Sequence, residues 1–535
     1  MAAKVGKGGG SRYKLTTVSV LPNRAGIGTL ATPRTVIQLS QQFCNPVATT
    51  PLRILQEYFG HAAFHTAQQA VIRRLIETPN RAGHSLLLMP TGGGKSLCYQ
   101  VPALMFDGGT LVVSPLIALM QDQVDRLRQR NIPATFINST VAAEEREARL
   151  RGFLEGNYKL LYVTPERFRR AEFARAISQA NIALLAVDEA HCISEWGHDF
   201  RPDYSRLAEF RAMIGNPLTI ALTATATAEV QQEIIEKLGL QPDQVQTFHQ
   251  GIERPNLRLE VEDLDRDHEK LAAMMGTIQR FGSGSGIIYF SLIQTLEKFS
   301  QMLADKRIGH GIYHGKMGAQ RRRAIQREFL AGKERLMLAT NAFGMGIDKA
   351  DIRFVVHAEV PSSVESYYQE IGRAGRDGEG ALCVLLYNQE DLATQMEFVK
   401  WSNPNAGFYS RLYGLLSDEE HANRMGMEYL REQLNYRNRR DFRLETALGM
   451  LDRYGVTEGS IEGRNLRITG DLADELVDDE RLAGKLRRAN LKLLSMVQYV
   501  RTEGCRRVHI SDYFGFPGAP ACGNCDRCSL QAEEF

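Results

Sequence analysis

The sequence has no uncharged apolar stretch of about 18 residues, the length that a membrane-spanning helix requires, so no membrane partner is expected. Its 535 residues include 8 cysteines and only 2 tryptophans. Four of the cysteines, Cys44, Cys98, Cys192 and Cys383, are scattered, which excludes a disulfide-stapled miniprotein and favours a reducing compartment. With 43% hydrophobic and 24% charged residues, the composition is that of a globular chain and excludes a disordered or fibrous one.

Acidic residues are absent from the first 50 positions, which carry six Lys or Arg and a glycine-rich run at 6–11. We expect residues 1–50 to form a disordered basic arm. The arm lacks the long apolar core of a secretory signal, and an organelle transit peptide and an artificial start are the alternatives. Over the whole chain, 65 basic and 63 acidic residues give a formal charge of +2, which neither requires nor excludes a nucleic-acid partner.

From about residue 51, short apolar runs alternate with amphipathic segments, as in a parallel sheet covered on both faces. The expected strands of a first unit are 86–89, 110–114, 160–163, 184–187 and 218–222. After a pause near 242–255 the pattern repeats, with expected strands at 287–290, 336–339, 354–357 and 381–387. The fold class is therefore α/β, with two successive α/β units at 51–245 and 246–400.

After Trp401 the chain becomes charge-rich and mostly helical. We expect a helical region at 401–480 and a small cysteine-containing module at 481–535. In the first region, a helix at 445–454 followed by a strand at 464–469 fits a winged helix, and a plain helical spacer is the alternative. The segment 481–510 carries eight Lys or Arg and one acid, so it is either a phosphate-contacting surface or an ordinary solvated face.

The segment 89–96, MPTGGGKS, lies between an expected strand and an expected helix. Glycines let such a loop curl until its N–H groups point at phosphate oxygens, while a lysine meets the outer phosphates and a serine ligates magnesium. Met89 stands where the strict pattern has glycine, but the strand–loop–helix setting supports an ATP-binding loop. Its expected contacts are Thr91, Gly92, Gly93, Gly94, Lys95 and Ser96.

Two further motifs complete a nucleotide site. Asp188 and Glu189 end an expected strand, where ligands of an α/β sheet bind; Asp188 would hold magnesium and Glu189 would deprotonate the attacking water. In QEIGRAGRDG at 369–378, Arg373 and Arg376 are three residues apart, and their guanidinium groups suit the charge of a transferred γ-phosphate. Because the motifs fall in different α/β units, we expect a composite ATP site between two domains, as in a motor.

The four remaining cysteines are Cys505, Cys522, Cys525 and Cys528. Two-residue gaps let successive thiolates converge on one metal ion. A structural zinc with four thiolate ligands is favoured, and an iron–sulfur cluster is the alternative.

These segments together resemble the RecQ family of superfamily-two helicases. The matches run in family order: LVVSPLIALMQDQV (111–124), YVTPERF (162–168), VDEAHCISEWGHDFRPDY (187–204), LTATAT (222–227), ATNAFGMGID (339–348) and QEIGRAGRDG. The aromatic-rich stretch 192–204 is the most specific. The run from Cys505 through CGNCDRC also resembles the RecQ zinc module. The resemblance implies two tandem RecA-like domains and 3′ to 5′ DNA unwinding driven by ATP and magnesium, in repair or recombination.

The resemblance also implies roles for individual residues. The aromatic-rich loop, with Trp196, His198, Phe200 and Arg201, couples single-stranded DNA to hydrolysis, since aromatic faces stack on bases and arginine meets phosphate. Matched positions that line the DNA track or link it to the ATP state are Ser114, Thr164, His191, Thr223, Thr225, Ser291 and Thr340. Gly346 and Asp348 join the nucleotide contacts, and Arg506 and Arg507 are candidate DNA contacts beside the zinc.

The segment 59–68, FGHAAFHTAQ, resembles the family's adenine-recognition motif, in which Gln68 bonds both edges of adenine through its amide. The family usually has arginine where His65 stands and often an aromatic residue where His61 stands. A neutral histidine can stack but brings no fixed charge, so these departures concern nucleotide affinity more than catalysis.

The leading hypothesis is a DNA helicase that acts on single-stranded and partially duplex DNA. A DNA-stimulated translocase that remodels nucleoprotein without separating strands, and an RNA helicase, are the alternatives. Intact Lys95, Asp188, Glu189 and Arg376 argue against a non-catalytic binding protein. The sequence identifies no protein partner, such as a single-strand-binding or recombination protein. The expected location is the nucleoid-containing cytoplasm of a bacterium, or the nucleus or an organelle of a eukaryote.

Overall fold

A computed structural model of the chain describes residues 50–78, 82–90, 92–194, 201–249, 251–344, 347–435 and 441–533. The basic arm predicted at 1–50 lies outside these ranges except for Thr50. Within them, no helix is both long enough and apolar enough to cross a membrane.

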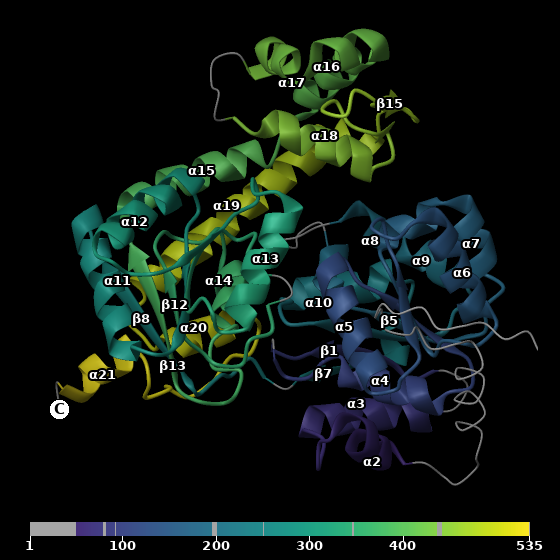
Figure 1. Cartoon of the computed structure of the whole chain (residues 1–535), viewed down its shortest axis with the longest axis horizontal. Helices are drawn as coiled ribbons and strands as arrows, with labels where there is room; N and C mark the ends of the chain where they lie inside the picture. Colours follow the sequence, from purple (N-terminus) through teal and green to yellow (C-terminus); the bar gives the residue numbers. More distant parts are fainter. Residues whose placement is uncertain are drawn as a thin grey trace, which may run out of the picture. The chain divides into compact units, whose positions relative to one another are not determined.

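The first sheet has seven parallel strands in the order β3-β4-β2-β5-β6-β1-β7 (Figure 1). Their bounds are β1 His84–Leu88, β2 Gly109–Val113, β3 Ala134–Ile137, β4 Leu160–Val163, β5 Ile182–Val187, β6 Leu218–Thr223 and β7 Val245–His249. The sequence predicted five of them and missed β3 and β7. The edge strand β7 is only partly buried and reads as mixed polar and apolar. It pairs with β1, so the first unit extends past our boundary at residue 245.

Helices cover both faces of this first lobe. On one face lie α2 (Pro51–Ile54), α3 (Thr66–Glu77), α4 (Leu97–Met105) and α5 (Ile117–Gln129). On the other lie α6 (Ala143–Leu154), α7 (Ala171–Ile177), α9 (Leu207–Met213) and α10 (Ala228–Lys237). This is the doubly covered parallel sheet that the uninterrupted apolar strands predicted.

The second sheet has six parallel strands in the order β10-β11-β9-β12-β13-β8. Their bounds are β8 Leu257–Asp263, β9 Ser285–Tyr289, β10 Gly311–Tyr313, β11 Leu336–Ala339, β12 Ile352–His357 and β13 Ala381–Tyr387. The sequence missed β8 and β10. Charged residues alternate with apolar ones along β8, and β10 has three residues, so neither gives the apolar run that marks a buried strand.

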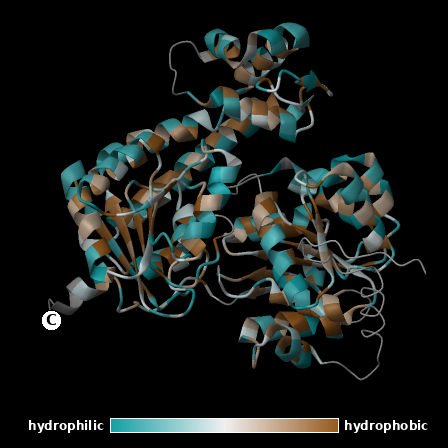
Figure 2. Ribbon diagram, viewed as in Figure 1, coloured by the Kyte–Doolittle hydropathy of each residue, from teal (hydrophilic) through white to brown (hydrophobic). Residues whose placement is uncertain are grey.

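One face of the second sheet is covered by α11 (Asp267–Phe281) and α12 (Ile293–Asp305). The other is covered by α13 (Ala319–Leu330), α14 (Val364–Ile371), α19 (Asp479–Arg501) and α20 (Arg506–Tyr513). The central strands of the sheet are mostly apolar, whereas the helices are apolar on one side only (Figure 2). The cysteine-containing segment therefore shares the core of the second lobe, and Tyr499 of α19 donates a hydrogen bond to the Tyr367 hydroxyl at 3.1 Å.

The region between the lobe and the cysteines is an insertion. Helix α15 (Gln389–Trp401) packs along α19, and residues 402–478 lie between these two helices in the chain. The insertion contains α16 (Ala406–Leu416), α17 (Glu419–Asn435), α18 (Arg443–Arg453) and a hairpin of β14 (Thr457–Glu458) and β15 (Arg467–Ile468). It has a hydrophobic core of its own. The helix predicted at 445–454 corresponds to α18, which Gly455 follows with a φ of +72°, and the strand predicted at 464–469 corresponds to the two-residue β15; the winged helix itself stays a prediction.

Candidate functional site

The glycine-rich loop joins β1 to α4 at the carboxyl edge of the first sheet. Gly92 and Gly94 have φ values of +85° and +78°, which side chains rarely adopt. A Cβ atom on Gly93 would lie 2.6 Å from Cγ of Met89. The methionine that departs from the strict motif therefore packs against the loop backbone, and the curled conformation is retained. Thr91 lies outside the described residues.

Gln68, the expected adenine ligand, is buried beside this loop. Its Nε2 donates to the carbonyl oxygens of Gly93 and Gly94 at 3.1 and 3.2 Å, and its Oε1 accepts from the His65 backbone N–H at 3.0 Å. Gln68 thus ties the start of α3 to the phosphate loop. His61 and His65 line a cavity that the phosphate loop also lines.

Asp188 and Glu189 follow β5 at the same edge of the sheet. Glu189 has φ +47° and ψ +47°, a left-handed conformation that is costly for a residue with a side chain and is often found at functional sites. Burial, followed by the neighbouring Glu189 charge, raises the pKa of Asp188 to about 7, and Lys95 opposes the shift. Asp188 and Glu189 place two carboxyl groups side by side near Lys95, and a bound cation would stabilise their charged form.

The second lobe contributes two arginines through the turn that follows α14. Arg373 is buried and donates to the Gly344 carbonyl oxygen. Arg376 pairs with Asp348 at 2.9 Å, and burial followed by the Arg373 charge lowers the pKa of Arg376 to about 10. Neither Nε atom has a hydrogen-bond acceptor among the described residues, so both arginines keep a buried donor available.

Asp348 also joins the two lobes. Arg126 on α5 of the first lobe pairs with its other carboxylate oxygen at 2.5 Å. Sequence reasoning missed Arg126, because a single arginine on an amphipathic helix reads as part of a solvated face.

Both lobes line one cavity of about 440 Å³. The residues predicted to meet the nucleotide share its walls: Gln68, Gly92, Gly93, Gly94, Lys95, Ser96, Asp188, Glu189, Asp348, Arg373 and Arg376. The structure therefore brings together the three motifs that the sequence placed in two α/β units. Gly346 lies outside the described residues.

The expected DNA-contacting hydroxyls lie where strands end at the carboxyl edges of the sheets. Ser114 follows β2, Thr164 follows β4 and Thr223 ends β6, while Ser291 and Thr340 follow β9 and β11 of the second lobe. His191 contacts Thr223, with Nδ1 and Oγ1 2.9 Å apart, and burial lowers the pKa of His191 to about 3. A hydrogen bond of 3.2 Å also links the Thr225 backbone N–H to Thr223 Oγ1.

The aromatic-rich loop is only partly described. Trp196, His198 and Phe200 lie outside the described residues. Arg201, at the end of the loop, donates its backbone N–H to Cys192 O at 3.0 Å and its Nη1 to Pro115 O at 3.0 Å. These bonds anchor the end of the loop beside Ser114 of the expected track.

The four cysteines converge on one point, with their Sγ atoms all within 4.8 Å of one another and those of Cys522 and Cys528 4.0 Å apart. Zinc–sulfur bonds of about 2.3 Å in a tetrahedron place sulfurs about 3.8 Å apart, so the cluster fits zinc. Although burial opposes it, backbone N–H donors, that of Cys522 first, lower the pKa of Cys505 to about 7. Burial instead raises the pKa of Cys522 to about 12 and also raises that of Cys528, so Cys505 is the cysteine of this cluster whose surroundings favour the thiolate that binds metal.

Arg506, predicted as a DNA contact, is structural, whereas the DNA contact of the half-buried Arg507 stays a prediction. Arg506 is 1% exposed, pairs with Asp526 at 2.9 Å and donates to the Tyr499 and Val500 carbonyl oxygens at the end of α19. Arg507 donates to backbone carbonyl oxygens just before and at the start of β8. Charge alone could not separate a phosphate contact from an arginine that satisfies buried carbonyl groups.

Three family models match the chain: DEAD/DEAH box helicase at residues 65–234, helicase conserved C-terminal domain at 269–378 and RecQ zinc-binding at 472–529. The last includes all four clustered cysteines, which form a zinc-binding site. The probable ATP-dependent DNA helicase RecS of Bacillus subtilis is 34% identical over 483 residues, covering 89% of this chain and 90% of RecS. The ATP-dependent DNA helicase RecQ of the same organism is 44% identical over 353 residues, 65% of this chain and 58% of RecQ.

The chain spans 54–58% of the length of the RecQ proteins of Bacillus subtilis, Haemophilus influenzae and Pasteurella multocida. Among solved structures, the helicase MrfA bound to DNA has a TM-score of 0.53 at 17% identity, covering 84% of this chain and 65% of MrfA. Mss116p bound to single-stranded RNA and AMP-PNP has a TM-score of 0.54 at 16% identity, covering 67% and 75%. At such identities these two structures establish the paired-lobe fold alone.

Proposed function

The chain belongs to the RecQ family of DNA helicases, and we propose that it couples ATP hydrolysis to 3′ to 5′ movement on single-stranded DNA and to duplex unwinding. The observation that carries the proposal is the cavity that both lobes line, with a phosphate loop and paired carboxyl groups on one side and two arginines on the other. A site divided in this way changes when the lobes move, so occupancy and hydrolysis can drive motion.

The residues take roles that follow from their positions. The loop Gly92–Ser96 and Lys95 would cradle the phosphates through backbone N–H groups and one ammonium charge. Glu189, beside the cavity, would accept the proton of the attacking water. Arg376, with Arg373 beside it, would stabilise the charge on the transferred phosphate, using donors that are already buried.

Magnesium is the cation expected with the triphosphate, and the donors present fit it. The Ser96 hydroxyl and the Asp188 carboxylate are oxygen ligands on the same cavity, and a dication would favour ionisation of Asp188. When bound, magnesium neutralises phosphate charge during transfer. Asp188 and Ser96 would hold it, while Glu189 remains available as the base.

DNA would lie across the carboxyl edges of both sheets. Hydroxyls and loop backbone at Ser114, Thr164, Ser291 and Thr340 suit phosphates and carry no base preference. His191 and Thr223 would link this track to the ATP site, because His191 lies two residues after Glu189 and contacts Thr223 directly. Trp196, His198, Phe200 and Arg201 would stack on and hold the single strand.

The first test is steady-state ATP hydrolysis with and without single-stranded DNA, on the wild type and on Trp196→Ala. We expect strong stimulation by DNA that the substitution abolishes, with nucleotide binding retained. Hydrolysis that is indifferent to DNA but stimulated by RNA would favour an RNA helicase. A forked duplex with a 3′ or a 5′ tail then separates unwinding from translocation: stimulated hydrolysis without strand separation on either fork would favour a nucleoprotein remodeller.

A further inference from the structure

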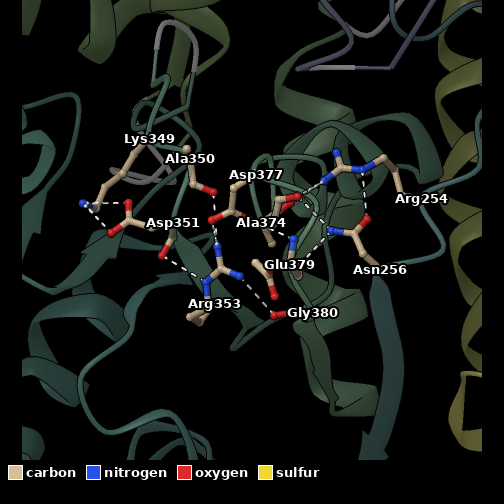
Figure 3. A network of polar contacts seen from close by, with 11 residues as sticks. Arg254, Asn256, Lys349, Ala350, Asp351, Arg353, Ala374, Asp377, Glu379 and Gly380 are labelled. Atoms are coloured by element: carbon tan, nitrogen blue, oxygen red, sulfur yellow. Dashed lines mark hydrogen bonds and ion pairs between the residues drawn. The ribbon is translucent and has the colours of Figure 1, made fainter. Parts of the chain in front are cut away.

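The turn at 372–380, which carries Arg373 and Arg376, is held by contacts from outside its own helix. The last carbonyl groups of a helix lack intrahelical partners. Here the Arg254 guanidinium donates to three carbonyl oxygens after α14: Gly372 at 3.2 Å, Gly375 at 2.9 Å and Ala374 at 2.7 Å. Figure 3 shows Arg254 beside Ala374. A rigid planar fork with several donors suits such a set of carbonyl groups, and lysine would not match it.

Asn256 completes the support from the same segment. Its Nδ2 donates to the carbonyl oxygens of Gly375 and Glu379 at 2.8 and 2.9 Å (Figure 3). Gly375 has a φ of +55°, and a Cβ atom there would lie 2.4 Å from that Nδ2. The amide is therefore packed directly on the backbone between Arg373 and Arg376. On the far side of the turn, Arg353 pairs with Asp377.

The segment that carries Arg254 and Asn256 is fixed in turn by the zinc module. Arg507, two residues after the zinc ligand Cys505, donates to the carbonyl oxygens of Arg254 and Leu257 at 3.1 and 2.8 Å. Asn524, between two zinc ligands, donates to Pro255 O at 3.2 Å.

Two more contacts continue this attachment along β8. Asp526, directly after Cys525, accepts the Val261 backbone N–H at 3.2 Å. Leu259 and Cys525 form a parallel β-bridge. Contacts from the zinc module thus follow the chain from Arg254 to Val261.

We infer that Arg254 is a positioning residue for the two arginines of the ATP site, and that the zinc module sets its position through Arg507 and Asn524. The inference rests on the proposed function of Arg376 in phosphate transfer. It assigns to the zinc module an effect on the chemistry of ATP in addition to a place in the core. The contacts that make up this network lie within the second lobe and the zinc module.

The test compares Arg254→Gln with the wild type and with Arg258→Ala, a matched arginine on β8 that pairs with Glu260 and does not touch the turn. We expect Arg254→Gln to lower kcat of basal ATP hydrolysis by about 10- to 100-fold, since small misplacements of catalytic groups have effects of that order, while KM for ATP is unchanged. ADP affinity should be retained and the affinity for ADP with aluminium fluoride should fall. A change in KM alone would overturn the inference.

A double-mutant cycle with Arg376→Ala separates positioning from a general loss of stability. We expect Arg254→Gln to lower kcat little further when Arg376 is already absent, because both changes remove the same interaction with the phosphate. Arg507→Gln and Asn524→Ala should lower kcat in the same direction as Arg254→Gln, with zinc content unchanged. Additive effects in the cycle, or full activity of both zinc-module variants, would overturn the inference.

Hydrogen exchange keeps the two proposals distinguishable. In Arg254→Gln, amides of the turn at 372–380 should exchange faster than in the wild type, whereas amides of the first lobe should not. An unchanged exchange rate in the turn would overturn the inference, whether or not DNA stimulates hydrolysis. Conversely, hydrolysis that responds to Arg254→Gln but not to DNA would leave the inference standing and contradict the proposed function.

Discussion

In the first lobe, the candidate catalytic groups follow directly from strands β1 and β5 and are held by neighbours in the same lobe. Gln68 bonds the phosphate loop 25 and 26 positions away, and the Asp188 backbone N–H donates to Val113 on the adjacent strand. In the second lobe, the arginine-bearing turn at 372–380 depends on residues much further along the chain. Arg254 lies 118–121 positions from the carbonyl groups it holds, and Arg507 lies 253 positions from Arg254.

The difference shows how one fold can divide a site between local and distant control. A loop built from a strand end needs little beyond its own glycines and the sheet beneath it. A turn held by long-range side-chain bonds takes its geometry from whatever fixes those side chains. Perturbation of the zinc module should therefore affect the second lobe and spare the first.

Zinc removal should give the largest difference in response between the two lobes. Structural zinc binds isolated zinc-finger peptides with about 10–16 kcal/mol of free energy, and this binding free energy is also folding free energy. We expect chelation, or Cys525→Ser, to increase hydrogen exchange in α20, β8 and the turn at 372–380 while β1 and β5 remain protected. Cys383→Ser, at a buried cysteine of β13 outside the cluster, is the matched control. Equal loss of protection in both lobes would contradict the division.

Arg376→Ala tests the second lobe's share of the chemistry. Arginine fingers contribute about 10³- to 10⁵-fold to phosphoryl transfer, so we expect kcat to fall by at least roughly 10³-fold. ATP binding should persist, because the phosphate loop lies in the first lobe. Arg280→Ala, at an exposed arginine on α11, should keep wild-type activity. Retained hydrolysis in Arg376→Ala would remove this residue from the site.

The same contrast explains what the sequence could predict. The nine predicted strands exist. Lys95, Asp188, Glu189, Arg373 and Arg376 could be proposed because each lies in a short contiguous motif whose chemistry is local, and all five line one cavity. The motifs also predicted a site between two lobes, and the cavity lined from both sides confirms that the motifs meet. The predicted zinc ligands converge: two-residue gaps bring Cys522, Cys525 and Cys528 together, and the fold of the module adds Cys505 across sixteen intervening residues.

The residues that hold these motifs in place could not be predicted from contiguous motifs. Arg254, Asn256 and Arg126 are single polar residues outside the motifs, and the contacts by which they support the site are to residues more than 100 positions away, which tertiary structure sets. Strands β7 and β8, in and just after the segment 242–255, were not predicted. An edge strand and a strand with alternating charge lack the apolar run that marks a buried strand. Arg506 was assigned to DNA because charge alone does not reveal burial, whereas its donors serve Asp526 and the carbonyl oxygens at the end of α19.

Glu189→Gln probes the first lobe alone. Glutamine keeps the shape of the side chain and removes the base, and general-base contributions are about 10²- to 10⁴-fold. We expect kcat to fall by roughly 10²-fold or more, with hydrogen exchange of the turn at 372–380 unchanged. Glu172→Gln, at an exposed glutamate on α7, serves as control. Altered exchange in the turn would show that the two lobes are not held independently.

The smallest effect expected is a pH dependence confined to the first lobe. His84 on β1 is 4% exposed, its Nδ1 accepts the Thr219 backbone N–H at 3.1 Å, and burial, then Arg211 and Arg74, lowers the pKa of His84 to about 4. Because this value lies below the unfolded value of about 6.5, the unfolded chain takes up the proton first as pH falls. Stability from the neutral ring is fully present above pH 6.5 and is lost towards pH 4, by about 2 kcal/mol at pH 5 for such a shift.

Urea unfolding between pH 5 and 7, monitored by hydrogen exchange in β1 and in β9, measures this loss in each lobe separately. In the wild type, we expect β1 to lose protection at the lower pH while β9 changes little. His84→Asn should remove the His84 share of the pH dependence of β1 and leave the shares of His191 and Asp188, because asparagine can still accept a hydrogen bond but does not titrate in this range. His268→Asn, at an exposed histidine on α11, should leave it intact. A pH dependence shared equally by β1 and β9 would mean that the lobes unfold as one cooperative unit, and that the division of the ATP site between local and distant supports does not extend to their stability.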